Sequence, residues 1–226
     1  MTVHEFGNPE ADIVLVQAVD EHDPALIESE IKAIRESFPD EFRLIALEVD
    51  DWNADLSPWR EPAVFGNADF GDGAANTLCE VKKLCADGSK TYFIGGYSLA
   101  GLFALWAAHE TDIFKGVAAA SPSIWFPGFS KYMKEHKIQS ASVYLSLGDR
   151  EEKTRNPVMS TVGGRIREAY GYLKENGIDC VLEWNQGNHF KDAVIRTAKA
   201  FAWVMSRQNK DLLKAKAGET GKCRDL

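Results

Sequence analysis

The sequence predicts an α/β fold in which a mostly parallel sheet carries helices on both faces. Short apolar runs alternate with longer helical segments along most of the chain, as in folds built from strand–helix–strand units. A glycine-rich turn at residues 95–101, which contains a serine, joins one apolar run directly to an apolar helix. Parallel sheets place their functional sites at the carboxyl ends of the strands. The pattern therefore predicts both a fold class and the edge of the sheet that carries the site.

The N-terminal half predicts three strands and two helices. Residues 13–19 (IVLVQAV) form an apolar run that is too short for a helix and indicates a buried strand. Asp23 and Pro24 have the pattern of a helix start, and apolar residues follow at helical spacing to residue 38. Residues 50–73 are irregular and long for a connection, and such loops are often functional. The remaining expected elements are a strand at 42–49, a helix at 71–86 and a strand at 91–95.

The C-terminal half continues the alternation. Residues 99–109 are apolar on nearly all sides, which predicts a buried helix. An apolar stripe at helical spacing predicts a second helix at 161–175. The other expected elements are strands at 116–120, 142–147 and 178–184 and a last helix at 191–207. We expect one domain over residues 1–209, followed by a polar C-terminal tail at 210–226.

Composition and charge narrow the class of protein. The 226 residues are 45% hydrophobic and 27% charged, which is ordinary for a globular domain. The net charge of −8 argues against a nucleic-acid partner. We see no secretory signal and no apolar run of about 20 residues, so a cytoplasmic location without a membrane span is expected. No metal-ligand spacing is present, and reduced thiols are expected at Cys79, Cys85, Cys180 and Cys223.

The turn at residues 95–101 reads Gly-Gly-Tyr-Ser-Leu-Ala-Gly and has the context of a nucleophile elbow. Gly96 stands two residues before Ser98, where a side chain would clash in the sharp turn. Ala100 occupies the position after the serine where a second glycine is usual. The alternative interpretation is a glycine-rich turn in which Ser98 only caps the helix. The pattern favours Ser98 as a nucleophile.

A serine nucleophile needs a base, and an acid that orients the base. His189 follows the expected strand at 178–184 and precedes the last helix, whereas His136 lies in a charged segment typical of a surface. The acid is expected after the strand at 142–147, in the segment Gly-Asp-Arg-Glu-Glu. Asp149 and Glu151 both fit this position, and Glu152 fits it less well.

These motifs resemble those of an esterase family of α/β-hydrolases that includes enterochelin, feruloyl and acetyl xylan esterases and S-formylglutathione hydrolase. The matching segments are Gly-Tyr-Ser-Leu-Ala-Gly-Leu-Phe, Gly-Asp-Arg-Glu-Glu-Lys and Gly-Asn-His-Phe. The resemblance implies a compact α/β-hydrolase fold over roughly residues 13–203. It also favours Glu151 as the acid, three residues after the glycine that ends its strand. The sequence departs from the family in three ways: it has Ala100 in place of a glycine, it lacks a His-Gly-Gly-Gly motif, and the chain is short. The first sheet strands of the family are expected to be absent here.

Further residues are expected to line the site. The backbone N–H of Leu99, at the start of a helix, is the expected first oxyanion donor, and Val19 at the end of the first strand is the expected second. Trp52 and Trp125 follow expected strands and are candidates for a substrate pocket, although packing of loops onto the core is the more ordinary explanation for such aromatic residues.

The resulting hypothesis is a serine esterase that cleaves a carboxylic ester through an acyl-enzyme, with Ser98, His189 and Glu151 as its catalytic triad. Its partner would be a small-molecule ester, and no cofactor or metal is implied. Two alternatives stay open: an acyltransferase with the same triad, and a hydrolase-like domain that binds without catalysis. The sequence indicates neither the acyl group, nor the alcohol, nor the oligomeric state.

Overall fold

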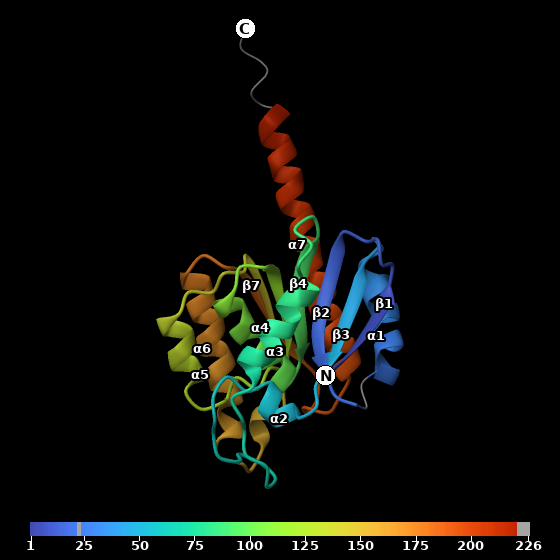
Figure 1. Cartoon of the computed structure of the whole chain (residues 1–226). Helices are drawn as coiled ribbons and strands as arrows, with labels where there is room; N and C mark the ends of the chain where they lie inside the picture. The colour runs from blue at the N-terminus through green and yellow to red at the C-terminus, as the bar shows by residue number, and fades with distance from the viewer. Residues whose placement is uncertain (22–23, 221–226) are drawn as a thin grey trace.

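A seven-stranded sheet forms the centre of the molecule in the computed structural model (Figure 1). The structure describes the backbone of residues 1–21 and 24–220 and the side chains of residues 1–21 and 26–208. The strand order is β1-β3-β2-β4-β5-β6-β7, and only β1 runs antiparallel to its neighbour. The strands are β1 (Thr2–Gly7), β2 (Ile13–Val19), β3 (Arg43–Glu48), β4 (Thr91–Tyr97), β5 (Phe114–Ala120), β6 (Ser142–Gly148) and β7 (Asp179–Asn185). The predicted α/β class with a mostly parallel sheet is confirmed.

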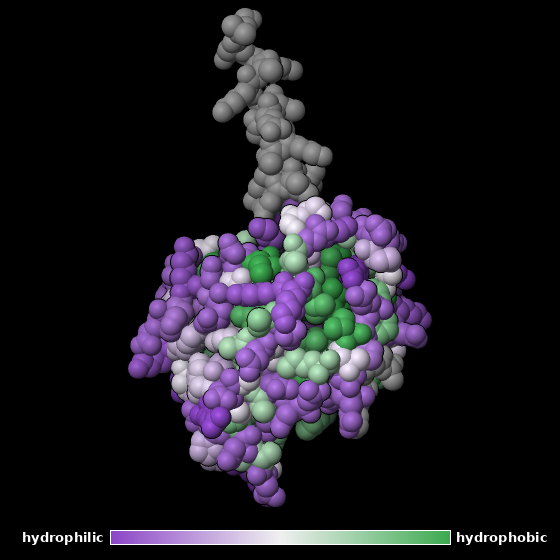
Figure 2. Space-filling view, in the orientation of Figure 1, coloured by the Kyte–Doolittle hydropathy of each residue, from purple (hydrophilic) through white to green (hydrophobic). Residues whose placement is uncertain are grey.

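Helices cover both faces of the sheet and bury a separate apolar core on each. Side chains of α1 (Pro24–Ser37) and α7 (Ala193–Thr220) form the core on one face. The core on the other face is contributed by α3 (Ala74–Leu84), α4 (Leu99–Glu110), α5 (Phe129–Glu135) and α6 (Val162–Glu175). Helix α4 is buried from Leu99 to His109, as its apolar sequence predicts. Apolar side chains reach the surface between α3 and β1 (Figure 2). Val3 of β1 is among the exposed apolar residues.

The expectation that the first sheet strands are absent is wrong, because β1 adds an antiparallel strand at the edge of the sheet. It pairs with β3 from Thr2–Glu48 to Gly7–Arg43. Its residues are mostly exposed, so the segment lacks the apolar run that indicates a buried strand. Polar contacts hold it in place, including an ion pair between Glu5 and Arg43 and a hydrogen bond between His4 and Glu48.

Other differences from the sequence prediction concern short elements and element ends. The short helix α2 (Trp52–Asp55), the helix α5 and two single turns of 3-10 helix, η1 (Glu151–Lys153) and η2 (Met159–Thr161), were not predicted. Helix α7 continues to Thr220 instead of ending at Arg207, and projects away from the sheet (Figure 1). The expected helix cap at Asp23 and the thiol of Cys223 lie outside the described residues.

The carboxyl ends of the parallel strands lie at the lower edge of Figure 1, together with α2 and the loop that follows it. Over the described part of the chain, the cysteines at 79, 85 and 180 are free. No described helix has the length and apolar character to cross a membrane. The described residues also contain no group of three His, Cys, Asp or Glu placed to hold a metal ion.

Candidate active site

Ser98 sits at the junction of β4 and α4 in a strained backbone conformation. Its φ of 57° and ψ of −119° lie outside the regions that residues with a side chain ordinarily adopt. The side chain makes no hydrogen bond that caps α4, so the alternative interpretation as a helix cap is not supported. Strain of this kind persists only where the surroundings enforce it, and it concentrates at functional sites. The geometry is that of a nucleophile elbow.

Gly96 makes room for this turn. A Cβ at Gly96, where φ is +156°, would lie 2.6 Å from the Cβ of Ala100. The alanine that replaces the usual glycine therefore fills the space that Gly96 leaves empty. A Cβ at Gly101 would lie 3.0 Å from the carbonyl oxygen of Gly96, so α4 approaches the sheet closely there.

Replacement of Gly96 by alanine tests this packing. We expect Gly96→Ala to lower the free energy of unfolding by about 3 kcal/mol, since the added Cβ overpacks the turn and strains the backbone. Urea denaturation measures the loss. The double variant Gly96→Ala/Ala100→Gly is the matched control and should recover part of it, because the closest clash is with the Ala100 side chain. A single variant as stable as the wild type would contradict the account of the turn.

Three of the predicted residues form one chain of hydrogen bonds. The Oγ of Ser98 lies 3.0 Å from Nε2 of His189, and Nδ1 of the same ring lies 2.7 Å from Oε2 of Glu151. Ser98 comes from the β4–α4 junction, Glu151 from η1 after β6, and His189 from the turn between β7 and α7. An ionised carboxylate only accepts, so Nδ1 carries the proton and Nε2 is free to accept from Ser98.

The structure separates the two candidate acids. Glu151 reaches His189, whereas Asp149 accepts a hydrogen bond from the backbone N–H of Gly187 at 2.8 Å. Asp149 therefore braces the turn that carries His189 but does not contact the imidazole ring. Glu152, the third possibility, forms an ion pair with Arg167. The remaining predicted alternatives thus have other partners, and Glu151 is the acid that faces the histidine.

Glu151 is held in its charged form although its side chain is only 5% exposed. Burial alone would raise the pKa of the Glu151 carboxyl, but the hydrogen bond and charge of His189, together with the N–H of Gly148, lower that pKa below its usual value. The second oxygen, Oε1, accepts from Gly148 N at 2.7 Å, from Ser121 Oγ at 2.8 Å and from Arg196 Nη1 at 2.9 Å. Its two oxygens are thus divided between the imidazole and a set of fixed donors.

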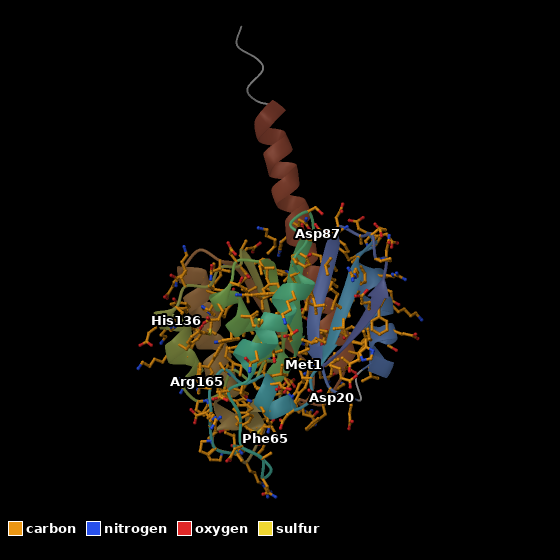
Figure 3. All side chains as sticks on the ribbon, in the orientation of Figure 1. Met1, Asp20, Phe65, Asp87, His136 and Arg165 are labelled. Atoms are coloured by element: carbon orange, nitrogen blue, oxygen red, sulfur yellow. The ribbon has the colours of Figure 1, made fainter. Side chains whose placement is uncertain are left out.

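The other histidines that follow Ser98 in the chain lie elsewhere. His136 is exposed at the end of α5, stacked on Tyr132, at the outer surface of the molecule (Figure 3). The prediction that it is a surface residue is confirmed. His109 is buried at the end of α4, bonded to the carbonyl of His136, and burial lowers its pKa to about 4.

The residues predicted to hold the oxyanion lie at the carboxyl ends of two neighbouring strands, since Val19 ends β2 and Leu99 comes two residues after the end of β4. Leu99 is the first residue of α4, so its N–H has no acceptor within the helix. Val19 ends β2, the neighbour of β4, and lines a pocket with Gly96 and Tyr97. Trp52, the first residue of α2, lines the same pocket, and its contact with substrate stays a prediction.

Trp125 belongs to an aromatic cluster rather than to this pocket. Its ring packs edge-on against Phe65 and Phe70, and only 7% of the residue is exposed. Phe65 lies in the loop at the lower edge of the molecule (Figure 3). The cluster therefore attaches the long loop between α2 and α3 to the core beside the site. A direct contact of Trp125 with substrate stays a prediction.

The sequence analysis missed the polar residues that support the triad. Ser121 follows β5 with a positive φ of 42°, and Arg196 lies in the first turns of α7. Ser123 Oγ lies 3.3 Å from Ser98 Oγ, and its N–H donates to the carbonyl of Ser98. No local pattern indicates these contacts, because each joins segments at least 25 positions apart.

Comparison with solved structures identifies the architecture. An IroE-like serine hydrolase from Shewanella oneidensis superimposes with a TM-score of 0.71 at 15% identity, over 85% of this chain and 70% of that one. The siderophore hydrolase EstA from Aspergillus nidulans gives a TM-score of 0.59 at 21% identity, over 88% of this chain and 83% of that one. The chain has the α/β-hydrolase fold. No protein-family model and no curated protein matches the sequence.

The enterobactin esterase FES from Shigella flexneri also matches, with a TM-score of 0.61 at 15% identity. The match covers 92% of this chain and 55% of the esterase, so this chain spans about half its length. In α/β-hydrolases the nucleophile, the acid and the histidine follow one another along the chain. Ser98, Glu151 and His189 occur in that order.

Proposed function

We propose that this α/β-hydrolase is a serine esterase that cleaves carboxylic esters through an acyl-enzyme. The observation that carries the proposal is the unbroken hydrogen-bond chain from Ser98 through His189 to Glu151, which starts at a strained elbow. The solved structures with the same fold include proteins named as a serine hydrolase, a siderophore hydrolase and a ferulic acid esterase. Those names support an ester as the substrate class.

In the first half of the proposed reaction, Ser98 Oγ attacks the ester carbonyl carbon while its proton passes to Nε2 of His189. Glu151 stabilises the imidazolium that forms and keeps the ring oriented. The carbonyl oxygen becomes an oxyanion, which the N–H of Leu99 at the positive end of α4 stabilises, with the backbone near Val19 as the second donor. The intermediate collapses as His189 returns the proton to the alcohol oxygen, and the alcohol leaves.

In the second half, water attacks the acyl group on Ser98 and gives its proton to His189. The second tetrahedral intermediate collapses to the free carboxylic acid, and the proton returns to Ser98 Oγ. Each step needs only an acid–base residue and an oxyanion donor, so the mechanism uses no cofactor. A small-molecule ester as the partner and a cytoplasmic location complete the proposal.

A panel of p-nitrophenyl and aryl esters tests this function, with kcat/KM measured for each. We expect hydrolysis of at least one short-chain ester, with release of one acid for each alcohol. Product analysis in the presence of added alcohols separates hydrolysis from acyl transfer, because a transferase would form the new ester in preference to the acid. Absence of turnover together with saturable binding of an ester would favour the non-catalytic alternative.

A further inference from the structure

Arg196 is a fully buried arginine beside the triad that the proposed mechanism does not use. It lies near the start of α7 and is 1% exposed. Burial of a charge is costly unless the charge is paired and hydrogen-bonded. The contacts of the Arg196 guanidinium must therefore offset the cost of burying its charge, and they are made beside the triad.

The guanidinium joins the acid to the turn that carries the histidine. Its Nη1 donates to Glu151 Oε1 at 2.9 Å, and also to the Tyr97 hydroxyl at 3.0 Å and to Ser121 Oγ at 3.2 Å. Its Nη2 donates to the backbone carbonyls of Gln186 and Asn188, at 3.3 and 3.2 Å. Tyr97 in turn donates to the carbonyl of His189 at 2.7 Å. One side chain thus fixes the acid and the backbone on both sides of Gly187.

The same contact changes the charge that the histidine experiences. Glu151 presents Oε2 to His189 while Oε1 is paired with the guanidinium. A lone buried carboxylate holds a proton on a neighbouring imidazole more strongly than a carboxylate whose charge is already balanced. The base of the proposed mechanism must be unprotonated when Ser98 attacks.

We propose that Arg196 is a positioning residue that fixes Glu151 and the His189 turn and, by balancing the carboxylate charge, keeps the base available in mildly acidic solution. This inference rests on the proposed function of the triad. The charged and titratable groups around His189 come from several elements. They are Glu151 on η1, Tyr97 at the end of β4, Arg196 in α7, Asp149 after β6 bonded to Gly187, and the exposed Lys191 and Asp192 in the turn itself.

The pH profile of kcat/KM tests this role, because a residue that is only structural would lower activity without moving the profile. In Arg196→Met, we expect the acid limb to move to higher pH by about one unit, since one neighbouring charge is lost. Arg196→Lys keeps the charge but loses the two-armed geometry. It should keep the wild-type limb while kcat falls by about tenfold, the loss expected of a less well positioned triad.

Arg207→Met is the matched control, because Arg207 lies on the same helix and is paired with Asp179, a residue of β7 outside the triad network. The acid limb of the kcat/KM profile of Arg207→Met should stay at the wild-type pH. If Arg196→Met does not fold, Arg196→Gln takes its place as the neutral variant.

The possible outcomes separate this inference from the proposed function. An unmoved limb in the neutral variant, with activity lost in Ser98→Ala, would reject the role of Arg196 and leave the esterase proposal intact. Retained activity in Ser98→Ala would reject the proposed function, and this inference with it. A limb that moves equally in Arg196→Lys and Arg196→Met would show that the charge is not responsible.

Discussion

Ser98→Ala is expected to lower kcat for ester hydrolysis by about 10⁶-fold, equivalent to about 8 kcal/mol of barrier, by analogy with serine proteases. The variant removes the atom that forms the acyl-enzyme, so the remaining rate would come only from substrate binding and the oxyanion donors. Initial rates with an activated ester measure the loss. Unfolding by urea should show little change, because the Ser98 hydroxyl does not cap α4.

Ser123→Ala is the matched control, since Ser123 carries a second hydroxyl whose Oγ lies only 3.3 Å from Ser98 Oγ. No hydrogen bond joins Ser123 to His189 in that part of the chain, so we expect a loss of less than about tenfold, as for one neutral hydrogen bond. A larger loss of kcat in Ser123→Ala than in Ser98→Ala would show that Ser98 is not the nucleophile.

Glu151→Gln is expected to lower kcat by about 10⁴-fold, as a change of acid to amide does in a serine protease triad. The amide leaves the shape of the turn unchanged, but its neutral oxygen no longer stabilises the imidazolium and its NH₂ group can favour the wrong tautomer. Steady-state kinetics at a fixed pH measure the loss, with circular dichroism as the check on folding.

Asp149→Asn is the control that separates the two acids. The amide oxygen of asparagine still accepts the hydrogen bond from Gly187, so we expect kcat to fall by less than about tenfold and the free energy of unfolding by about 1 kcal/mol. Equal losses in the two variants would contradict the assignment of Glu151. A larger loss in Asp149→Asn would reverse it.

The sequence predicted Ser98 and His189 as a pair because their signals are local. An elbow needs a strand, a small residue before the serine and a helix after it, and all three are visible between residues 91 and 110. His189 lies between the last strand and the last helix, where few other histidines compete. The structure places both side chains within hydrogen-bond distance of each other.

The choice between Asp149 and Glu151 depends on the path of one turn. Both are carboxylates two positions apart, and no pattern in the sequence distinguishes their directions. In the structure, the single turn η1 begins at Glu151, so this side chain points back toward Gly148 and His189. The resemblance to esterases favoured Glu151, and the geometry agrees with it.

The strand β1 and the contacts of Arg196 were not predictable because they depend on tertiary structure. An exposed edge strand has no apolar run, and β1 is stabilised by pairing with residues 43–48. A buried arginine gives no signal in a helix until its partners from β4, η1 and the residue after β5 are placed around it. The predicted boundaries of the longer elements agree more closely with the structure, because the apolar periodicity of the sequence indicates them directly.

Labelling with a fluorophosphonate probe, followed by peptide mass mapping, tests the central claim most directly. The probe phosphonylates an activated serine and leaves unactivated hydroxyls unchanged, so its attachment reports the nucleophile. We predict one adduct on the peptide that contains Ser98, absent in Ser98→Ala and much slower to form in His189→Ala. An adduct on another residue, or an unlabelled Ser98 in protein that hydrolyses esters, would contradict the account.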